Sequence, residues 1–233
     1  ATAVVVQACA FVRFTTAELR QGGCTAKELK QNGFPVPDML EGGFTVSELR
    51  LGGFTPNEMK SGGYTMKQIK VGGFSPGELK VAGFPASELR AGGYSAGDMK
   101  PVGYTLSELR TGGFLVPELR ACNYNAYELK SVGFSMTELK KGGLSAAELK
   151  SAGCSVDEMR ECGFRAKQLR AVGYTAQDLK ASAAFACNDL RLAGYPVEQL
   201  YEVGYTALEL KDSGYTAKEL KGGGISAQEL KRG

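Results

Sequence analysis

Basic side chains recur at every tenth residue over most of this chain, and they are its strongest candidates for binding chemistry. Lys or Arg occupies 20 of 22 equivalent positions, and the exceptions are Leu40 and Tyr201. Stacked repeats would align these cations into rows suited to a polyanion such as nucleic acid, an acidic filament or an anionic membrane surface. The candidate interaction surface consists of Arg50, Lys60, Lys70, Lys80, Arg90, Lys100, Arg110, Arg120, Lys130, Lys140 and Lys150, together with Leu40, Tyr127 and Tyr201.

A blander interpretation of the same cations is that each is offset by the acid two residues before it and only solvates the surface. The net charge of +3 is too small to imply a polyanion partner by itself. The chain has no Trp, and the spacing of its Phe and Tyr residues assigns them to packing, which weakens the case for base stacking. We therefore favour the solvated surface over a polyanion site.

Catalytic chemistry is poorly supported by the residue types present. The absence of His removes the commonest general base and metal ligand. The carboxylate pairs Asp157/Glu158 and Glu158/Glu161 are better explained as exposed helix positions than as an acid–base pair. The Gly-Gly pairs are not part of a phosphate-binding G-x-x-x-x-G-K-[ST] motif, and no C-x-x-C pair suggests zinc. We expect no catalytic residues, cofactor or metal, and regard an enzyme such as a hydrolase as remote.

The regular spacing comes from a ten-residue repeat that is written 22 times between Phe14 and Gly233. A repeat that covers nearly the whole chain determines the fold class. The positions are named here after the copy at 44–53: the aromatic position (Phe44), the capping position (Thr45), the acid position (Glu48), the core position (Leu49), the cation position (Arg50) and the terminal glycine (Gly53).

Each repeat carries the signals that begin and end a helix. The hydroxyl of Thr55 and the acid Glu58 form a capping box, and the aromatic residue before the cap packs on the apolar residue four positions after it. Gly is the residue that most readily adopts positive φ after a helix end, so Gly53 and Gly143 are predicted to stop their helices. The result is a helix of about seven residues per repeat.

Such short helices are not stable alone in water, so they must stack on one another. The sequence predicts an all-α solenoid of about 22 very short helices, in which the aromatic and core positions and the small residues beside them form the interior. The remaining positions face water.

The pattern resembles tandem decapeptide repeats of the form G-[FY]-[ST]-x-x-E-L-[KR], a resemblance that implies no activity. Large apolar residues also recur every five positions, as in Phe44, Leu49 and Phe54, which resembles pentapeptide-repeat proteins and implies a right-handed β-helix as the alternative. That family needs small inward residues where this chain has Lys27 and Asp157, and burying such charges would be prohibitive.

The predicted organisation has four parts. An apolar cap segment, 1–13, precedes a regular array at 14–180. The irregular copy at 181–190 has one extra residue, replaces the terminal glycine with Ala184 and lacks a cap at Ala186; Ala184 and Phe185 are counted as structural residues, and a bend is expected there. Repeats of the same solenoid follow at 191–233.

The six cysteines lie mostly where the repeat wants a small apolar residue, so we expect reduced core residues rather than a disulfide framework. Reduced cysteines favour an intracellular reducing compartment. No segment approaches the roughly twenty apolar residues of a membrane span. The sequence thus favours a scaffold, spacer or linker that contacts other protein subunits, with binding of an anionic polymer as the alternative.

Overall fold

A computed structural model describes residues 14–183 and 185–232, and its regular structure in these ranges is helical throughout. The described residues form 22 α-helices and one 3-10 helix, with no strand among them. The predicted all-α solenoid is confirmed, and the β-helix alternative is not supported. The predicted cap segment 1–13 and Ala184 lie outside the described residues.

The chain divides into two units, Ala1–Asn123 and Tyr124–Gly233. The helices of the first unit are α2 (Thr16–Gln21), α3 (Ala26–Gln31), α4 (Val36–Glu41), α5 (Val46–Leu51), α6 (Pro56–Ser61), α7 (Met66–Val71), α8 (Pro76–Val81), α9 (Ala86–Ala91), α10 (Ala96–Met99), η1 (Lys100–Val102), α11 (Leu106–Thr111) and α12 (Val116–Arg120). Those of the second unit are α13 (Ala126–Ser131), α14 (Met136–Lys141), α15 (Ala146–Ser151), α16 (Val156–Glu161), α17 (Ala166–Ala171), α18 (Ala176–Ala181), α19 (Cys187–Leu192), α20 (Val197–Glu202), α21 (Ala207–Asp212), α22 (Ala217–Gly222) and α23 (Ala227–Arg232).

Helices begin at the predicted capping boxes. At α6 the Glu58 backbone N–H donates to the Thr55 hydroxyl at 3.3 Å, and the Thr55 N–H donates to the Glu58 carboxylate at 2.6 Å. Where a residue without a suitable side chain occupies the capping position, as at Leu115 and Arg165, the backbone N–H still donates to the acid position. The acid position therefore supplies half of the cap by itself.

Helices end where glycine adopts positive φ, as predicted. Gly53 has φ +84°. Its N–H donates to the Arg50 carbonyl, and the Phe54 N–H donates to the Leu49 carbonyl, both at 3.0 Å. This pair of bonds is a Schellman motif, in which the residue after the glycine also packs on the last turn. Phe54 thereby ends one helix and precedes the cap of the next.

Two residues other than glycine take the same conformation. Asn123 has φ +60°, and Ala183 has φ +51°. The terminal-glycine position predicted for the irregular repeat, Ala184, lies outside the described residues, and Ala183 before it has the positive φ. The extra residue of that repeat lies in the loop after α18, because the helix-end bonds from Ser182 and Ala183 keep their usual spacing.

The helices are slightly shorter than predicted. Most have six residues rather than about seven, because the residue before the terminal glycine already leaves the helical ψ range; Gly52, for example, has ψ −6°. Pro101 shortens α10 to four residues and converts its end into the 3-10 helix η1, as expected for Pro in a last turn.

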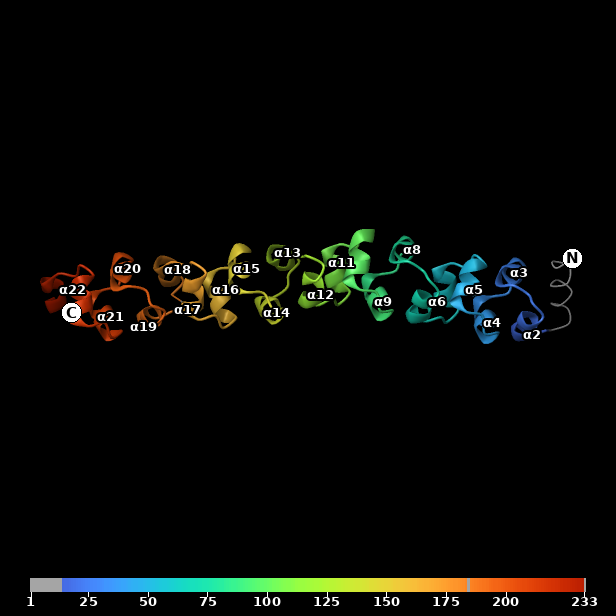
Figure 1. The fold of residues 1–233 in the computed structure, drawn as a ribbon, viewed down its shortest axis with the longest axis horizontal. Coiled ribbons are helices and arrows are strands. Elements are labelled where there is room, and N and C mark those ends of the chain that lie inside the picture. The colour runs from blue at the N-terminus through green and yellow to red at the C-terminus, as the bar shows by residue number, and fades with distance from the viewer. Residues whose placement is uncertain (1–13, 184, 233) are drawn as a thin grey trace. The chain divides into compact units, whose positions relative to one another are not determined.

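Successive helices alternate between two columns within each unit (Figure 1), so that each helix contacts the next but one, as α5 contacts both α3 and α7. Two helices thus complete each turn of the solenoid. The core position is fully buried, with Leu49, Met59 and Ile69 all at 0% exposure. The small residue before the terminal glycine permits this stacking: a Cβ on Gly52 would lie 2.9 Å from the backbone nitrogen of Lys27 in α3.

Tyrosine at the aromatic position adds a polar link that the repeat pattern alone does not predict. The hydroxyl of Tyr104 donates to the Phe84 carbonyl at 2.7 Å, and that of Tyr94 donates to the Phe74 carbonyl at 2.5 Å. Each bond spans 20 residues, one turn of the solenoid. Burial raises the pKa of both phenols, which keeps them protonated as donors.

Two alanine substitutions in the first unit test the role of the terminal glycine. Gly53→Ala should reduce the free energy of unfolding by about 1–2 kcal/mol, because an L-residue is strained at positive φ. No atom lies within 4 Å of the added Cβ, so the loss would not be a clash. The control Gly77→Ala, within α8, should instead add about 0.5–1 kcal/mol. If urea unfolding showed that both substitutions change the free energy of unfolding in the same direction, the role assigned to Gly53 would be contradicted.

Candidate interaction surface

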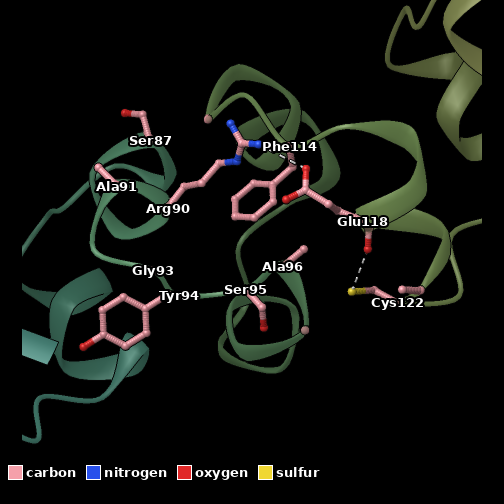
Figure 2. Close-up of a pocket in the computed structure, with 13 residues that line it drawn as sticks. Ser87, Arg90, Ala91, Gly93, Tyr94, Ser95, Ala96, Phe114, Glu118 and Cys122 are labelled. Atoms are coloured by element: carbon pink, nitrogen blue, oxygen red, sulfur yellow. Dashed lines mark hydrogen bonds and ion pairs between the residues drawn. The ribbon is translucent and has the colours of Figure 1, made fainter. Parts of the chain in front are cut away.

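The cation position does not simply face solvent but closes over the stack. In Figure 2 Arg90 reaches from α9 to Phe114 and Glu118, at the start of α12. Its guanidinium carbon lies 5.2 Å from the centre of the Phe114 ring, and its Nη2 lies 3.2 Å from the Glu118 carboxylate. We call this arrangement a clamp. It consists of the cation of one helix and two groups of the third helix further along the chain: the aromatic ring that precedes that helix and the acid in its first turn.

The clamp recurs along both units. Six ion pairs join a cation position to the acid position 28 residues later, at 2.6–3.2 Å. Because the two helices belong to opposite columns, each clamp ties the columns together. The pairs are Arg20–Glu48, Lys30–Glu58, Arg50–Glu78, Lys60–Glu88, Arg90–Glu118 and Lys130–Glu158.

These pairs correct the expectation that each cation is offset by the acid two residues before it. Arg50 pairs with Glu78, whereas Glu48 pairs with Arg20. The physical reason is that residues two apart on a helix do not face each other. The three-helix reach depends on the pitch of the solenoid, which the repeat alone does not specify.

Some cations bind a backbone carbonyl instead of an acid. For Lys150, the acid position 28 residues later holds Asp178, whose side chain is shorter than that of Glu. Lys150 donates to the Val172 carbonyl at 3.1 Å instead, and its Nζ lies 4.6 Å from the centre of the Tyr174 ring. The ring contact is thus kept when the ion pair is not. Other carbonyl bonds of this kind are Lys70 to Gly93, Lys80 to Gly103, Lys100 to Cys122, Lys140 to Cys162 and Lys180 to Val203.

The remaining predicted surface residues lie in varied surroundings. Arg110 and Arg120 are half-buried. Tyr201 replaces a cation and still reaches the acid 28 residues on, because its hydroxyl donates to Glu229 at 2.5 Å. Tyr127 is exposed on α13. Leu40 occupies the cation position without any polar group to offer.

In four of the clamps, those at Glu48, Glu58, Glu78 and Glu158, the pKa of the carboxylate is lowered. The pKa of Glu78 is lowered by the hydrogen bonds from the Ser75 backbone and hydroxyl and by Arg50. The Glu158 carboxylate, in turn, raises the pKa of Lys130. Since the side chains of these pairs are 30–51% exposed, water and salt screen them, and each contributes modestly to stability.

The surface has open grooves, each of which lies between two neighbouring helices of the same column. Five of them, with volumes of about 440 to about 860 Å³, are lined by equivalent repeat positions: the start of one helix and the helix that follows it in the same column. In the groove of Figure 2 the clamp Arg90–Phe114–Glu118 forms one wall, and Ser95 and Ala96 line the start of α10. The same groove is therefore repeated rather than built once.

Other kinds of site find little support in the described part of the chain. Its His, Cys, Asp and Glu residues form no group that could hold a metal ion. Among its cysteines, Cys122, Cys154, Cys162 and Cys187 are free thiols, of which Cys154 is buried. None of its helices is long and apolar enough to cross a membrane.

Comparison with known families yields one match. The model of a decapeptide repeat region matches residues 9–76, 63–130, 123–186 and 173–233, which together span nearly the whole chain. No curated protein matches it.

A double-mutant cycle measures the clamp between repeats. Arg50→Met and Glu78→Gln should show a coupling of about 0.2–1 kcal/mol, the range of an exposed ion pair. The control cycle, Arg50→Met with Glu48→Gln, should show none, since those side chains do not pair. Equal coupling in both cycles, measured by urea unfolding, would contradict the clamp.

Acid should weaken the fold through the same carboxylates. The pKa of Glu78 in the folded chain lies below its ordinary value of 4.5, so the unfolded chain binds more protons as pH falls through this range. The stabilisation is complete above about pH 4.5 and is lost as pH falls through the folded pKa. Thermal unfolding from pH 7 to pH 3 should show this loss. Glu78→Gln should make this loss of stability with falling pH shallower. An amide does not titrate, yet it can serve in a capping box, as Gln68 does by accepting from the Thr65 N–H.

Proposed function

Because the chain belongs to the decapeptide repeat family, we propose that it is a non-enzymatic scaffold that holds other protein subunits through its repeated surface. The observation that carries the proposal is the repetition of one groove at equivalent positions in both units. A surface of this kind suits many similar contacts, as in other stacked-repeat proteins. Multiple weak contacts made together give strong binding without a deep pocket.

The groove chemistry supports a binding role over catalysis. In the groove of Figure 2, two of the polar groups already serve the fold: Ser95 caps α10, and Glu118 accepts from both Arg90 and the Leu115 N–H. An enzyme site would need groups held near a substrate and not consumed by the fold.

The clamps support a protein partner over a polyanion. A phosphate group that bound Lys60 would compete with the Glu88 carboxylate, at 2.6 Å, and with the Phe84 ring, whose centre is 5.2 Å away. Similar contacts occupy cations throughout both units. Binding a polyanion along these rows would therefore break contacts that hold the two columns together.

Purification from the source cell at two salt concentrations tests the proposal. The tagged full chain should retain a protein partner in fixed stoichiometry at both about 0.05 M and about 0.2 M salt, whereas a polyanion complex would weaken by orders of magnitude over this range. Mass spectrometry and absorbance at 260 nm identify what is retained.

The control variant Lys141→Gln/Lys167→Gln removes two exposed cations of the second unit and should leave the protein complex unchanged. Retention of nucleic acid alone, with release by moderate salt, would favour the anionic-polymer alternative. A monomer without partners at both salt concentrations would also contradict the scaffold.

A further inference from the structure

The groove between α5 and α7 differs from the others in the charges that line it. At its wall Leu40 holds the cation position, and the acid position 28 residues later holds Gln68. No clamp can form there. The groove has a volume of about 440 Å³, and its side-chain lining includes Leu40, Phe44, Val46, Tyr64, Lys67, Gln68 and Val71. We call it the neutral groove.

The loss of both charges is confined to this place in the repeat array. Tyr201 also lacks a cation, yet its hydroxyl reaches Glu229. Gln168 also lacks a charge, yet the cation 28 residues before it is Lys140, which lies over the Phe164 ring at 4.6 Å. Only Leu40 combines an apolar cation position with a neutral partner.

The altered residues leave apolar surface exposed. The Leu40 side chain extends in the same direction as the cations it replaces. Its Cδ2 lies 3.4 Å from the place that a Cβ on Gly63 would occupy. In the next repeat, Nη1 of Arg50 lies 3.3 Å from the equivalent place on Gly73. Across the groove Val71 is 84% exposed. An apolar side chain placed between Leu40 and Val71 would remove both from water without desolvating an ion pair.

The charge beside the neutral groove is positive. Helix α7 has no acid in its first turn, and its exposed Lys67 lines the groove. The second cation of the helix, Lys70, donates to the Gly93 carbonyl and lies away from this lining. A carboxylate next to an inserted apolar side chain would complement Lys67.

We propose that the neutral groove binds an exposed segment of a partner protein in which a Leu or Phe side chain is flanked by a carboxylate. The apolar side chain lies between Leu40 and Val71, and the carboxylate faces Lys67. The inference rests on the proposed scaffold function and assigns one of its contacts to a particular groove and a particular class of segment.

A fluorescein-labelled heptapeptide with Leu between two Asp residues is the probe, and fluorescence polarisation measures its Kd. Leu40→Arg/Gln68→Glu restores the common clamp, which should cover the groove and weaken binding about tenfold or more. Peptides with Ser for Leu, or Lys for Asp, should bind the unaltered chain more weakly by a similar factor. Circular dichroism and thermal unfolding confirm that the variant is folded.

The groove between α3 and α5 supplies a matched gain-of-site control. It carries the Arg20–Glu48 clamp, together with Lys27 and the exposed Leu51. Arg20→Leu/Glu48→Gln removes the clamp and should raise the stoichiometry from one to two peptides per chain.

Failure of the peptide to bind the unaltered chain, or equal binding by Leu40→Arg/Gln68→Glu, would overturn the inference. The scaffold function fails separately. If the purified protein complex forms equally well with this variant, the neutral groove is not its contact, although the scaffold function stands. If no complex forms with the unaltered chain, the scaffold function itself is wrong.

Discussion

The left-handed backbone conformation at the end of each helix is the constraint on which this architecture depends. At Gly53 it allows two N–H groups to return to the last turn of α5, and it sends the chain directly into the cap of α6. A six-residue helix has too few internal hydrogen bonds to be stable by itself. Closing both ends within ten residues brings every second helix into contact, so the buried Leu, Met and Ile of successive repeats form a continuous core in each unit. The repeat is thus a unit of packing as much as of sequence.

The acid position both caps its own helix and forms an ion pair with a distant helix, so local and long-range structure depend on each other. Glu78 accepts from the Ser75 N–H at 2.7 Å, which begins α8, and from Arg50 at 3.0 Å, which ties α8 to α5. The cation completes the arrangement by lying 5.1 Å from the centre of the Phe74 ring. A repeat that changes one member of this clamp alters its own surface without changing the helices beneath, as Leu40 and Gln68 do. The chemistry of the surface can therefore vary along the chain while the fold is kept.

Much of the fold was predictable because its signals are local. The capping box at Thr55 and Glu58, the terminal glycine at Gly53 and the helix break at Pro101 each depend on a few neighbouring residues. The partners of the cations were not predictable in this way, since pairing over 28 residues follows from the pitch of the stack and the reach of the side chain. The tyrosine bonds over 20 residues escaped prediction for the same reason. In the irregular repeat, the four consecutive small residues Ala181–Ala184 left the helix end ambiguous, and the structure gives the positive φ to Ala183.

Amide hydrogen exchange followed by NMR tests the central claim most directly. The account predicts protection that recurs every ten residues at the aromatic position, where the Phe54 N–H is held by Leu49 and the Phe44 N–H by Met39. The first two N–H groups after each cap, which have no helical partner, should exchange fast. Fast exchange at the aromatic position throughout the array, or protection that alternates from residue to residue as in a strand, would contradict helices closed by a left-handed residue.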